Sequence, residues 1–531
     1  MKASHHVFRH AGSPSESSRR DLLTREQRRL LAGVCIVVGA ASTVPASYNF
    51  VVVPMLEGLG ASEEQGSLLR ELPSIAGLLV IFLAGILGRR WGERRFITRC
   101  GILFTVGNAV VAVAPVMGVA VAGLVLESIG ASGFIVVGLA LLSSRVSDEK
   151  GRASAFSTYA TVGPITYVVM PLLAGVLLDN SSWRLVAAVW ALSGVVILVA
   201  SRTLLPAAEG PQDTQELLTP LLAGVLMVAA VQTLNSVNRD GLISVSALVR
   251  LAIGVVAFAA LVWAWRRVEH PSLSLAALGQ GGMYLLLIIV ILMSFANLWF
   301  YMTVGLQYLY GLNALGTAVA LLPAQAAAIL GAVITRWLLR RRGITVAGSV
   351  MLLGLAVSLL VSALISAGSP MWVPVLVTCF YAITSVGAGI PLTNAIMDLA
   401  PSGEDGSASA FRSAASNIGG AVGVIVMSTI VFSAFSASLA ATLKSEGLDS
   451  QQSVQIAESV REGVTSDEVA ANYAVPVQQV EQIAEAQQEA MVDGLRMHGL
   501  SGAAFTGVCL VIFLWSRRRQ THDSVPAAAG D

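Results

Sequence analysis

Gly151-Arg-Ala-Ser-Ala-Phe156 and Gly406-Ser-Ala-Ser-Ala-Phe411 are two copies of one phrase, 255 residues apart, and each opens a long apolar stretch. A second phrase repeats at nearly the same offset, since Arg89-Arg90-Trp91-Gly92 is followed 251 residues later by Arg340-Arg341-Arg342-Gly343. Two phrases in the same order at the same spacing indicate a duplicated unit. Duplicated halves of membrane helices are the architecture of solute transporters.

The composition places the chain in a membrane. Of its 531 residues, 55% are hydrophobic and 12% are charged, whereas a soluble domain carries about a quarter charged residues. The net charge of +1 argues against nucleic acid as a partner. The expected partner is therefore the lipid bilayer. The four cysteines lie in or beside apolar segments and show neither metal nor redox spacing, so they predict no disulfide framework.

Fourteen apolar segments are long enough to cross a bilayer, which takes about 20 residues. They are 30–56, 68–88, 96–115, 118–142, 153–178, 184–205, 217–235, 245–265, 282–306, 315–339, 345–367, 372–392, 407–434 and 499–516. The first segment holds Val44-Pro45-Ala46, which resembles a signal-peptide cleavage site. Because the apolar run continues to Leu56, we expect a first span that is retained.

Lysine and arginine give these spans an orientation. If the loops are assigned alternately to two sides, the side of the N-terminus receives 26 of the 33 lysines and arginines, and the other side receives 7. By the positive-inside rule both termini are cytoplasmic, which requires an even number of spans. We therefore expect a multi-pass protein of the plasma or inner membrane.

The repeats divide the chain into two like halves of an all-α membrane protein. The expected parts are a cytoplasmic tail (1–29), an N-terminal six-helix bundle (30–206), a linker with two extra helices (207–281), a C-terminal six-helix bundle (282–516) that includes an outer loop (436–498), and a cytoplasmic tail (517–531). Because both repeats run in the same direction, we expect their pseudo-axis along the membrane normal and the solute path between the halves.

No sequence motif points to an enzyme or to a nucleotide-driven pump. Neither a Gly-x4-Gly-Lys phosphate loop nor a His-Glu-x-x-His zinc motif occurs. Gly387-Ala-Gly-Ile-Pro391 ends an apolar segment, where it predicts a helix bend. We expect no cofactor and no metal, and we expect an ion or solute gradient to supply the energy.

Several phrases follow known transporter patterns. Gly85-Ile-Leu-Gly-Arg-Arg-Trp-Gly92-Glu-Arg-Arg95 follows Gly-x-Leu-x-Asp-Arg-x-Gly-Arg, and Pro171-Leu-Leu-Ala-Gly175 follows Gly-Pro-x-x-Gly-Gly. Further matches are Asp179-Asn-Ser-Ser-Trp183-Arg184, Glu269-His-Pro271, Gln307 to Pro323, and Gly406 to Gly423. In this order they resemble the major facilitator superfamily, specifically its fourteen-helix drug:proton antiporter branch. The resemblance covers about residues 30–516 and implies alternating access with proton-coupled export of amphipathic small molecules or drugs.

Three residues depart from the family pattern. Arg89 stands where the family signature has an acidic residue, and Leu124 stands where the fourth helix has an arginine. The aspartate common in the first helix falls near Pro45. These positions are associated in the family with proton coupling and gating. Two alternatives to proton-coupled export therefore stay open: a proton-independent or differently coupled solute transporter, and a transporter-like sensor or scaffold without flux.

Glu127 is the leading candidate for binding protons or substrate. It lies about nine residues into its apolar segment, where an ionised carboxylate costs about 2.5–3.5 kcal/mol. Burial at this depth disfavours the charged form and favours reversible protonation. The alternative is a neutral or paired carboxyl that fixes helix contacts. Arg70 and Glu71 are further candidates, although a helix N-terminus and a snorkelling side chain explain them equally well.

Two larger sets of residues are expected to form the cavity and the moving contacts. The cavity candidates are Tyr48, Asn49, Asn297, Trp299, Tyr301, Gln307 and Gln325. The gating and helix-packing candidates are Gly85, Arg89, Arg90, Gly92, Gly163, Pro164, Pro171, Gly175, Gly419 and Gly423. The alternatives are an interfacial belt for the aromatic residues and topology determination alone for the arginines.

Two segments outside the spans also carry patterns. Thr24-x-x-Gln27 predicts a capping box at the start of the first helix. The acidic outer loop predicts a helix from Val477 to Met497. This loop is expected to be a solvated connector, with a lid or a partner surface as alternatives.

Overall fold

The first membrane span consists of two helices, α1 (Arg25–Ala41) and α2 (Thr43–Gly58), which meet at Ser42. The predicted capping box is confirmed at its start. The Gln27 backbone N–H donates to Thr24 Oγ1 at 3.2 Å, and the Thr24 N–H donates to Gln27 Oε1 at 3.0 Å. These two bonds satisfy backbone donors that a helix start leaves free.

The computed structural model describes residues 23–61, 63–146, 148–207, 216–241, 244–268, 278, 282–312, 314–401, 404–445, 452–456 and 477–523. After α2 the N-terminal half continues with α3 (Glu63–Trp91), α4 (Glu93–Ala112), α5 (Met117–Arg145), α6 (Glu149–Asn180) and α7 (Trp183–Thr203). Two further helices follow, α8 (Leu218–Asp240) and α9 (Val245–Arg267). The predicted match at Glu269-His-Pro271 lies outside the described residues.

The C-terminal half begins with a broken span. It consists of α11 (Met283–Met293), the short 3-10 helix η3 (Ser294–Ala296) and α12 (Leu298–Tyr310). The remaining helices are α13 (Ala314–Ser362), α14 (Trp372–Asp398), α15 (Asp405–Ser445) and α18 (Val477–Asp523). The sequence predicts one continuous span over 282–306, so the break at Ser294–Ala296 is a feature that the apolar pattern does not indicate.

The described residues form thirteen helices that are long and apolar enough to cross a membrane. One of them, α13, contains two crossings, because Gly343 turns the chain with φ 79° and ψ 177°. The all-helical fold with fourteen crossings is therefore confirmed. Gly92, the matching glycine of the first Arg-Arg-x-Gly phrase, has the same φ of 79°. A positive φ suits glycine, which has no Cβ, so the repeated phrase marks the same turn in both halves.

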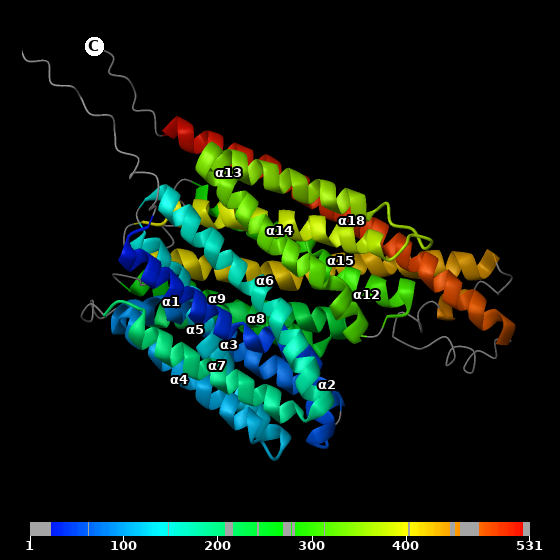
Figure 1. Cartoon of the computed structure of the whole chain (residues 1–531), viewed down its shortest axis with the longest axis horizontal. Helices are drawn as coiled ribbons and strands as arrows, with labels where there is room; N and C mark the ends of the chain where they lie inside the picture. Colours follow the sequence, from blue (N-terminus) through cyan, green and yellow to red (C-terminus); the bar gives the residue numbers. More distant parts are fainter. Residues whose placement is uncertain are drawn as a thin grey trace, which may run out of the picture.

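The helices assemble into two bundles, as Figure 1 shows, with α1 to α7 on one side and α11 to α18 on the other. Across the boundary, α6 packs on α13 and α14, and α15 packs on α3 and α5. The inserted helices α8 and α9 pack on each other, and α8 lies against α3 and α15. In each half, the helix that carries the repeated six-residue phrase therefore packs on the other half.

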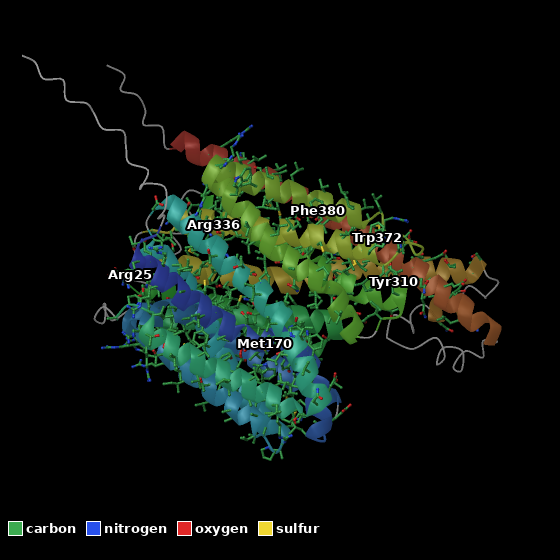
Figure 2. The ribbon with its side chains drawn as sticks, viewed as in Figure 1. Arg25, Met170, Tyr310, Arg336, Trp372 and Phe380 are labelled. Carbon is green, nitrogen blue, oxygen red and sulfur yellow. The ribbon has the colours of Figure 1, made fainter. Side chains whose placement is uncertain are left out.

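The start of α1 and the end of α18 lie at the same end of the molecule, at the left of Figure 1. We call this end the terminal face, and the other end the opposite face. In Figure 2, Arg25 and Arg336 lie toward the terminal face, whereas Trp372 and Tyr310 lie toward the opposite face. Two ends on one face agree with an even number of crossings.

Helices α15 and α18 extend past the other helices at the opposite face (Figure 1). Helix α18 begins at Val477, which confirms the predicted helix in the outer loop. The two extensions are joined by a hydrogen bond in which Ser438 Oγ donates to Asp493 at 2.7 Å. The centre of the loop, residues 446–451 and 457–476, lies outside the described residues.

Candidate functional site

The two halves meet at the terminal face through the Gly406 phrase. Gly406 lies directly on Gly85 of α3, because a Cβ on Gly85 would lie 2.7 Å from the Gly406 carbonyl oxygen. Ser409 Oγ donates to the Val136 carbonyl of α5 at 3.0 Å. Phe411 packs edge to face on Phe82, with ring centroids 5.9 Å apart. The first turns of α15 are therefore docked on the N-terminal half.

The Gly151 phrase makes the reciprocal contacts. Arg152, in the first turn of α6, forms an ion pair with Asp398 at the end of α14. Ser154 Oγ accepts a hydrogen bond from Arg340 Nη2 at 3.4 Å. Backbone contact, hydrogen bonds and an ion pair thus join the halves at the same face, and both copies of the repeat contribute.

Arg89 supplies charge to this closed face. It is half-buried and is attracted electrostatically by Glu404 and Asp405, which begin the α15 region of the other half. Arg89, Asp405, Gly85 and Gly406 line a cleft of about 280 Å³. Position 89, where the family signature has an acid, thus carries a cation on α3 in this chain. The acids that attract it lie across the boundary, in the other half.

A cavity of about 300 Å³ lies between the halves on the side of the opposite face. Four helices line it, two from each half: α2, α6, α12 and α13. Its residues are Pro45, Ala46, Asn49, Phe50, Tyr167, Pro171, Leu172, Trp299, Thr303, Gln307, Thr317, Ala318, Val319, Leu321, Leu322 and Gln325. No charged side chain is among these described lining residues.

Four of the seven cavity candidates come together here, namely Asn49, Trp299, Gln307 and Gln325. Pro171, predicted for gating, also lines the cavity. Trp299 is held in place by an edge-to-face contact with Tyr381 of α14, with centroids 6.3 Å apart. The cavity thus combines aromatic and aliphatic walls with side-chain amides from both halves.

The other three candidates lie elsewhere. The Tyr48 hydroxyl donates to the Leu69 carbonyl at 3.0 Å, within the N-terminal half. The exposed Asn297 caps α12, where its Oδ1 accepts from the Trp299 N–H at 3.2 Å. Tyr301 is buried inside the C-terminal half, with its hydroxyl 3.1 Å from Ser428 Oγ. None of these three residues is among the lining residues of the cavity.

Glu127 lies inside the N-terminal half and is 6% exposed. It sits where α4 crosses α5 closely, because a Cβ on Gly107 would lie 2.6 Å from the Glu127 backbone nitrogen. Within the described part of the chain its carboxyl makes no hydrogen bond or ion pair. Glu71 is half-buried at the start of its span. The side chain of Arg70 lies outside the described residues, and so does the suggested pair between Arg70 and Glu127.

Apart from Gly85 and Gly92, the glycines and prolines of the gating set lie on α6 and α15. Helix α6 stays continuous through Gly163, Pro164, Pro171 and Gly175. On α15, Gly419 and Gly423 pack within their own half against the broken span. Cβ atoms there would lie 2.7 Å from Ile291 Cα and 3.0 Å from the Ser294 carbonyl oxygen. The remaining members, Arg90 and Gly92, lie at the turn from α3 to α4.

Two ionisable residues were not singled out from the sequence. Arg412 lies two turns into α15, where its Nε donates to Thr393 Oγ1 at 2.8 Å. It also interacts electrostatically with Tyr159 of the other half. His498 is fully buried with its ring 4.5 Å from that of Tyr301. The sequence signal for Arg412 was a cation inside an apolar segment. His498 lies just before the predicted span 499–516, so the hydropathy pattern does not predict that its side chain is buried.

Comparisons with known proteins fit this architecture. The family model described as Major Facilitator Superfamily matches residues 31–424. The drug efflux pump JefA of Mycobacterium tuberculosis is 24% identical over 495 residues, which are 89% of this chain and 95% of that protein. The multidrug transporter mfsC of Aspergillus fumigatus is 27% identical over 359 residues, 66% of this chain. The chain spans 64% of that fungal protein.

Solved structures share the fold at low sequence identity. The human organic anion transporter MFSD10 superposes with a TM-score of 0.61 over 92% of this chain and 100% of that chain, at 11% identity. The fucose:proton symporter of E. coli gives 0.53 over 93% of this chain and 99% of that chain, at 13% identity. These structures are similar to this chain in helix arrangement.

Proposed function

This chain belongs to the major facilitator superfamily of membrane transporters, and we propose that it is a secondary active transporter that exports amphipathic small molecules or drugs in exchange for protons. Relatives described as efflux pumps align with 89% of the chain at 24% identity, which favours export of this kind. We further propose that the terminal face is cytoplasmic, since 26 of the 33 lysines and arginines fall on the side of the termini.

The proposed mechanism is alternating access by rocking of residues 30–206 against residues 282–516. The observation that carries it is the pairing of a closed face with a cavity. Both copies of the repeat lock the halves at the terminal face, while the cavity between the halves lies toward the opposite face. Breaking the small set of terminal-face contacts and closing the cavity would exchange access from one side to the other.

The cavity suits an amphipathic substrate. Aromatic and aliphatic walls favour an apolar body, and a few fixed polar groups orient a ligand in such a pocket. Here the polar groups are the amides of Asn49, Gln307 and Gln325, which come from both halves. A ligand that contacts both halves binds the two end states differently, so it can shift the equilibrium between them.

Glu127 is the proposed proton carrier. Its carboxyl is buried among helices of one half, where the neutral form is favoured until a polar path or a partner reaches it. Arg70 and Glu71 are proposed to influence access to it from the opposite face. Because Glu127 is absent from the cavity lining, coupling would act through the α4–α5 packing and not through direct contact with substrate.

The test uses purified protein in proteoliposomes with ethidium as the probe. We expect an imposed pH gradient to drive ethidium transport, and we expect Glu127→Gln to abolish that transport while substrate exchange without a gradient persists. Glu57→Gln, which neutralises an exposed carboxyl at the end of α2, is the matched control and should behave as wild type. Gradient-driven transport that survives Glu127→Gln would remove this residue from its role.

A proton-independent facilitator is the second candidate function. Pro45 lines the cavity near the position where the family branch has an aspartate, and Leu124 is 2% exposed where the family has an arginine. Neither side chain can exchange a proton. Ethidium exchange that is equally fast with and without a pH gradient would favour this candidate, and no ethidium movement in either assay would favour a sensor or scaffold.

A further inference from the structure

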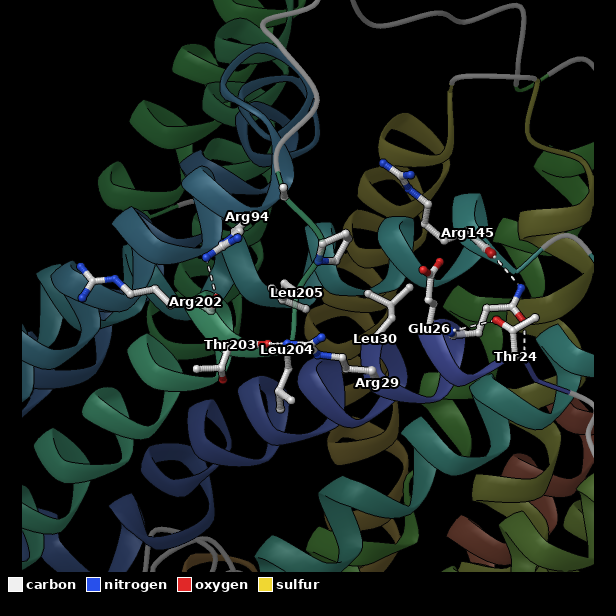
Figure 3. Close-up of a pocket in the computed structure, with 13 residues that line it drawn as sticks. Thr24, Glu26, Arg29, Leu30, Arg94, Arg145, Arg202, Thr203, Leu204 and Leu205 are labelled. Carbon is white, nitrogen blue, oxygen red and sulfur yellow. Dashed lines mark hydrogen bonds between the residues drawn. The ribbon is translucent and has the colours of Figure 1, made fainter.

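A basic hollow opens at the terminal face, where α1 and α4 begin and α5 and α7 end (Figure 3). Its volume is about 490 Å³, and its described lining includes Arg29, Arg94, Arg202 and a single acidic residue, Glu26. An adjoining hollow of about 540 Å³ shares Arg94 and Arg202 and adds Arg95 and Arg99. We refer to the two together as the basic hollow.

Two of the arginines are fixed by the end of α7. Arg29 donates to the Thr203 carbonyl, and Arg94 Nη2 donates to the Arg202 carbonyl at 2.5 Å. A guanidinium has five N–H donors, so one such bond orients the group and leaves donors for a ligand. Arg145 contributes its backbone, since its carbonyl accepts from Gln27 Nε2 at 3.1 Å while its side chain points away in Figure 3.

Tryptophan–arginine pairs show the depth at which the hollow lies. Four tryptophans near the terminal face each have an arginine over the ring. The pairs, with the distance from Cζ to the ring centroid, are Trp91 with Arg99 (4.4 Å), Trp263 with Arg267 (5.9 Å), Trp337 with Arg341 (5.0 Å) and Trp515 with Arg519 (3.7 Å). Tryptophan concentrates at the headgroup level of a bilayer. Arg99 belongs to the hollow, so the hollow lies at that level.

On α4 an apolar stripe continues from the hollow toward the membrane centre. Arg95, Arg99, Ile102 and Val106 follow the i, i+4, i+7, i+11 spacing of one helix face. Ile102 is 45% exposed and Val106 is 47% exposed, so both side chains lie on the outer surface of the bundle. The face therefore changes from cationic to apolar along its length.

Helix α7 repeats the arrangement. Arg202, Val199, Val195 and Leu192 lie on one face, and the three apolar residues are 57%, 44% and 62% exposed. The helices α4 and α7 pack against each other. Guanidinium groups at one level, with exposed aliphatic stripes beside them, match a molecule that has an anionic head and long apolar chains.

We propose that the basic hollow binds the phosphate of an anionic phospholipid, whose acyl chains lie along the α4 and α7 stripes. Guanidinium geometry fits phosphate oxygens, and basic pockets between membrane helices take anionic headgroups. Inorganic phosphate shares the head chemistry but would leave the apolar stripes without a ligand. The inference concerns binding alone and does not depend on which solute the protein moves.

The test measures lipid retention by native mass spectrometry on the full-length protein purified in detergent and mixed with equal amounts of phosphatidylglycerol and phosphatidylcholine. We expect wild type to retain phosphatidylglycerol preferentially. Arg95→Gln with Arg202→Gln should lower the preference by roughly 5-fold per arginine. The matched control, Arg266→Gln with Arg267→Gln, removes two arginines from the last turn of α9 and should keep the preference. Glu26→Gln, which removes the single acid of the described lining, should raise the preference for phosphatidylglycerol.

Three results would overturn the proposal. One is equal retention of the two lipids by wild type. Another is an equal loss in the α9 control, which would indicate general surface charge. The third is displacement of phosphatidylglycerol by millimolar inorganic phosphate, which would indicate a site for a soluble anion. Thermal unfolding of each variant, followed by circular dichroism, checks that a lost preference does not reflect a lost fold.

Discussion

At the scale of single residues, charge at the terminal face is arranged across the boundary between the halves. Arg89 on α3 is attracted by Glu404 and Asp405, and Arg152 on α6 pairs with Asp398 on α14. The N-terminal half thus contributes both cations, and the C-terminal half contributes the acids that they meet. The sequence shows Arg89 only as a departure from the family signature, because the compensating acids lie more than 300 residues away.

Gly85 gives the sharpest single-residue prediction. Its contact with Gly406 leaves no room for a Cβ, which would lie 2.7 Å from a backbone oxygen. Gly85→Val is therefore expected to keep the terminal face open. In a Ser409→Cys background, the cysteine should then become accessible to labelling by a membrane-impermeant maleimide. Gly389→Ala is the matched control, because nothing lies within 4 Å of its Cβ position. Unchanged protection of Ser409→Cys in the Gly85 variant would contradict the closed-face role.

At the scale of helices, hydropathy predicted the crossings because the length and apolar character of a span are local properties of the sequence. The sequence shows the Arg-Arg-x-Gly phrase only as a repeat, and the structure shows that its glycines, Gly92 and Gly343, adopt the same φ of 79°. The break in the ninth span was not predictable in this way. Its residues are apolar on both sides of Asn297, and the helix that packs on the break, α15, is more than 100 residues away in the sequence.

The packing of α15 on this break is the element-level prediction. Gly419 touches the backbone of Ile291, so Gly419→Val should destabilise the C-terminal half by about 1–3 kcal/mol through overpacking. The expected readout is a lower thermal unfolding temperature of the purified protein. Gly420→Ala, one residue away with open space at its Cβ, should leave that temperature unchanged or raise it. An equal fall in both variants would contradict the role of the contact, because helix propensity alone favours alanine and valine over glycine.

At the scale of the whole molecule, the duplication explains the symmetry of the closed face. The six-residue phrase opens α6 in one half and α15 in the other, and each copy docks on the partner half. Four residues that the sequence groups as cavity candidates line one cavity, and the sequence can group them because polar and aromatic residues in predicted spans are few. It did not separate them from Tyr48 and Tyr301, since the direction of a side chain within a bundle depends on packing.

The central claim is that the two halves move as bodies, with one face closing as the other opens. The most direct measurement is a pair of distances by double electron–electron resonance, in a variant whose native cysteines are replaced. Exposed sites at the terminal face are Ser144 and Arg342, and exposed sites at the opposite face are Val116 and Trp372. We predict two populations, in which a short terminal-face distance accompanies a long opposite-face distance and the reverse. Distances that lengthen or shorten together at both faces would contradict the account.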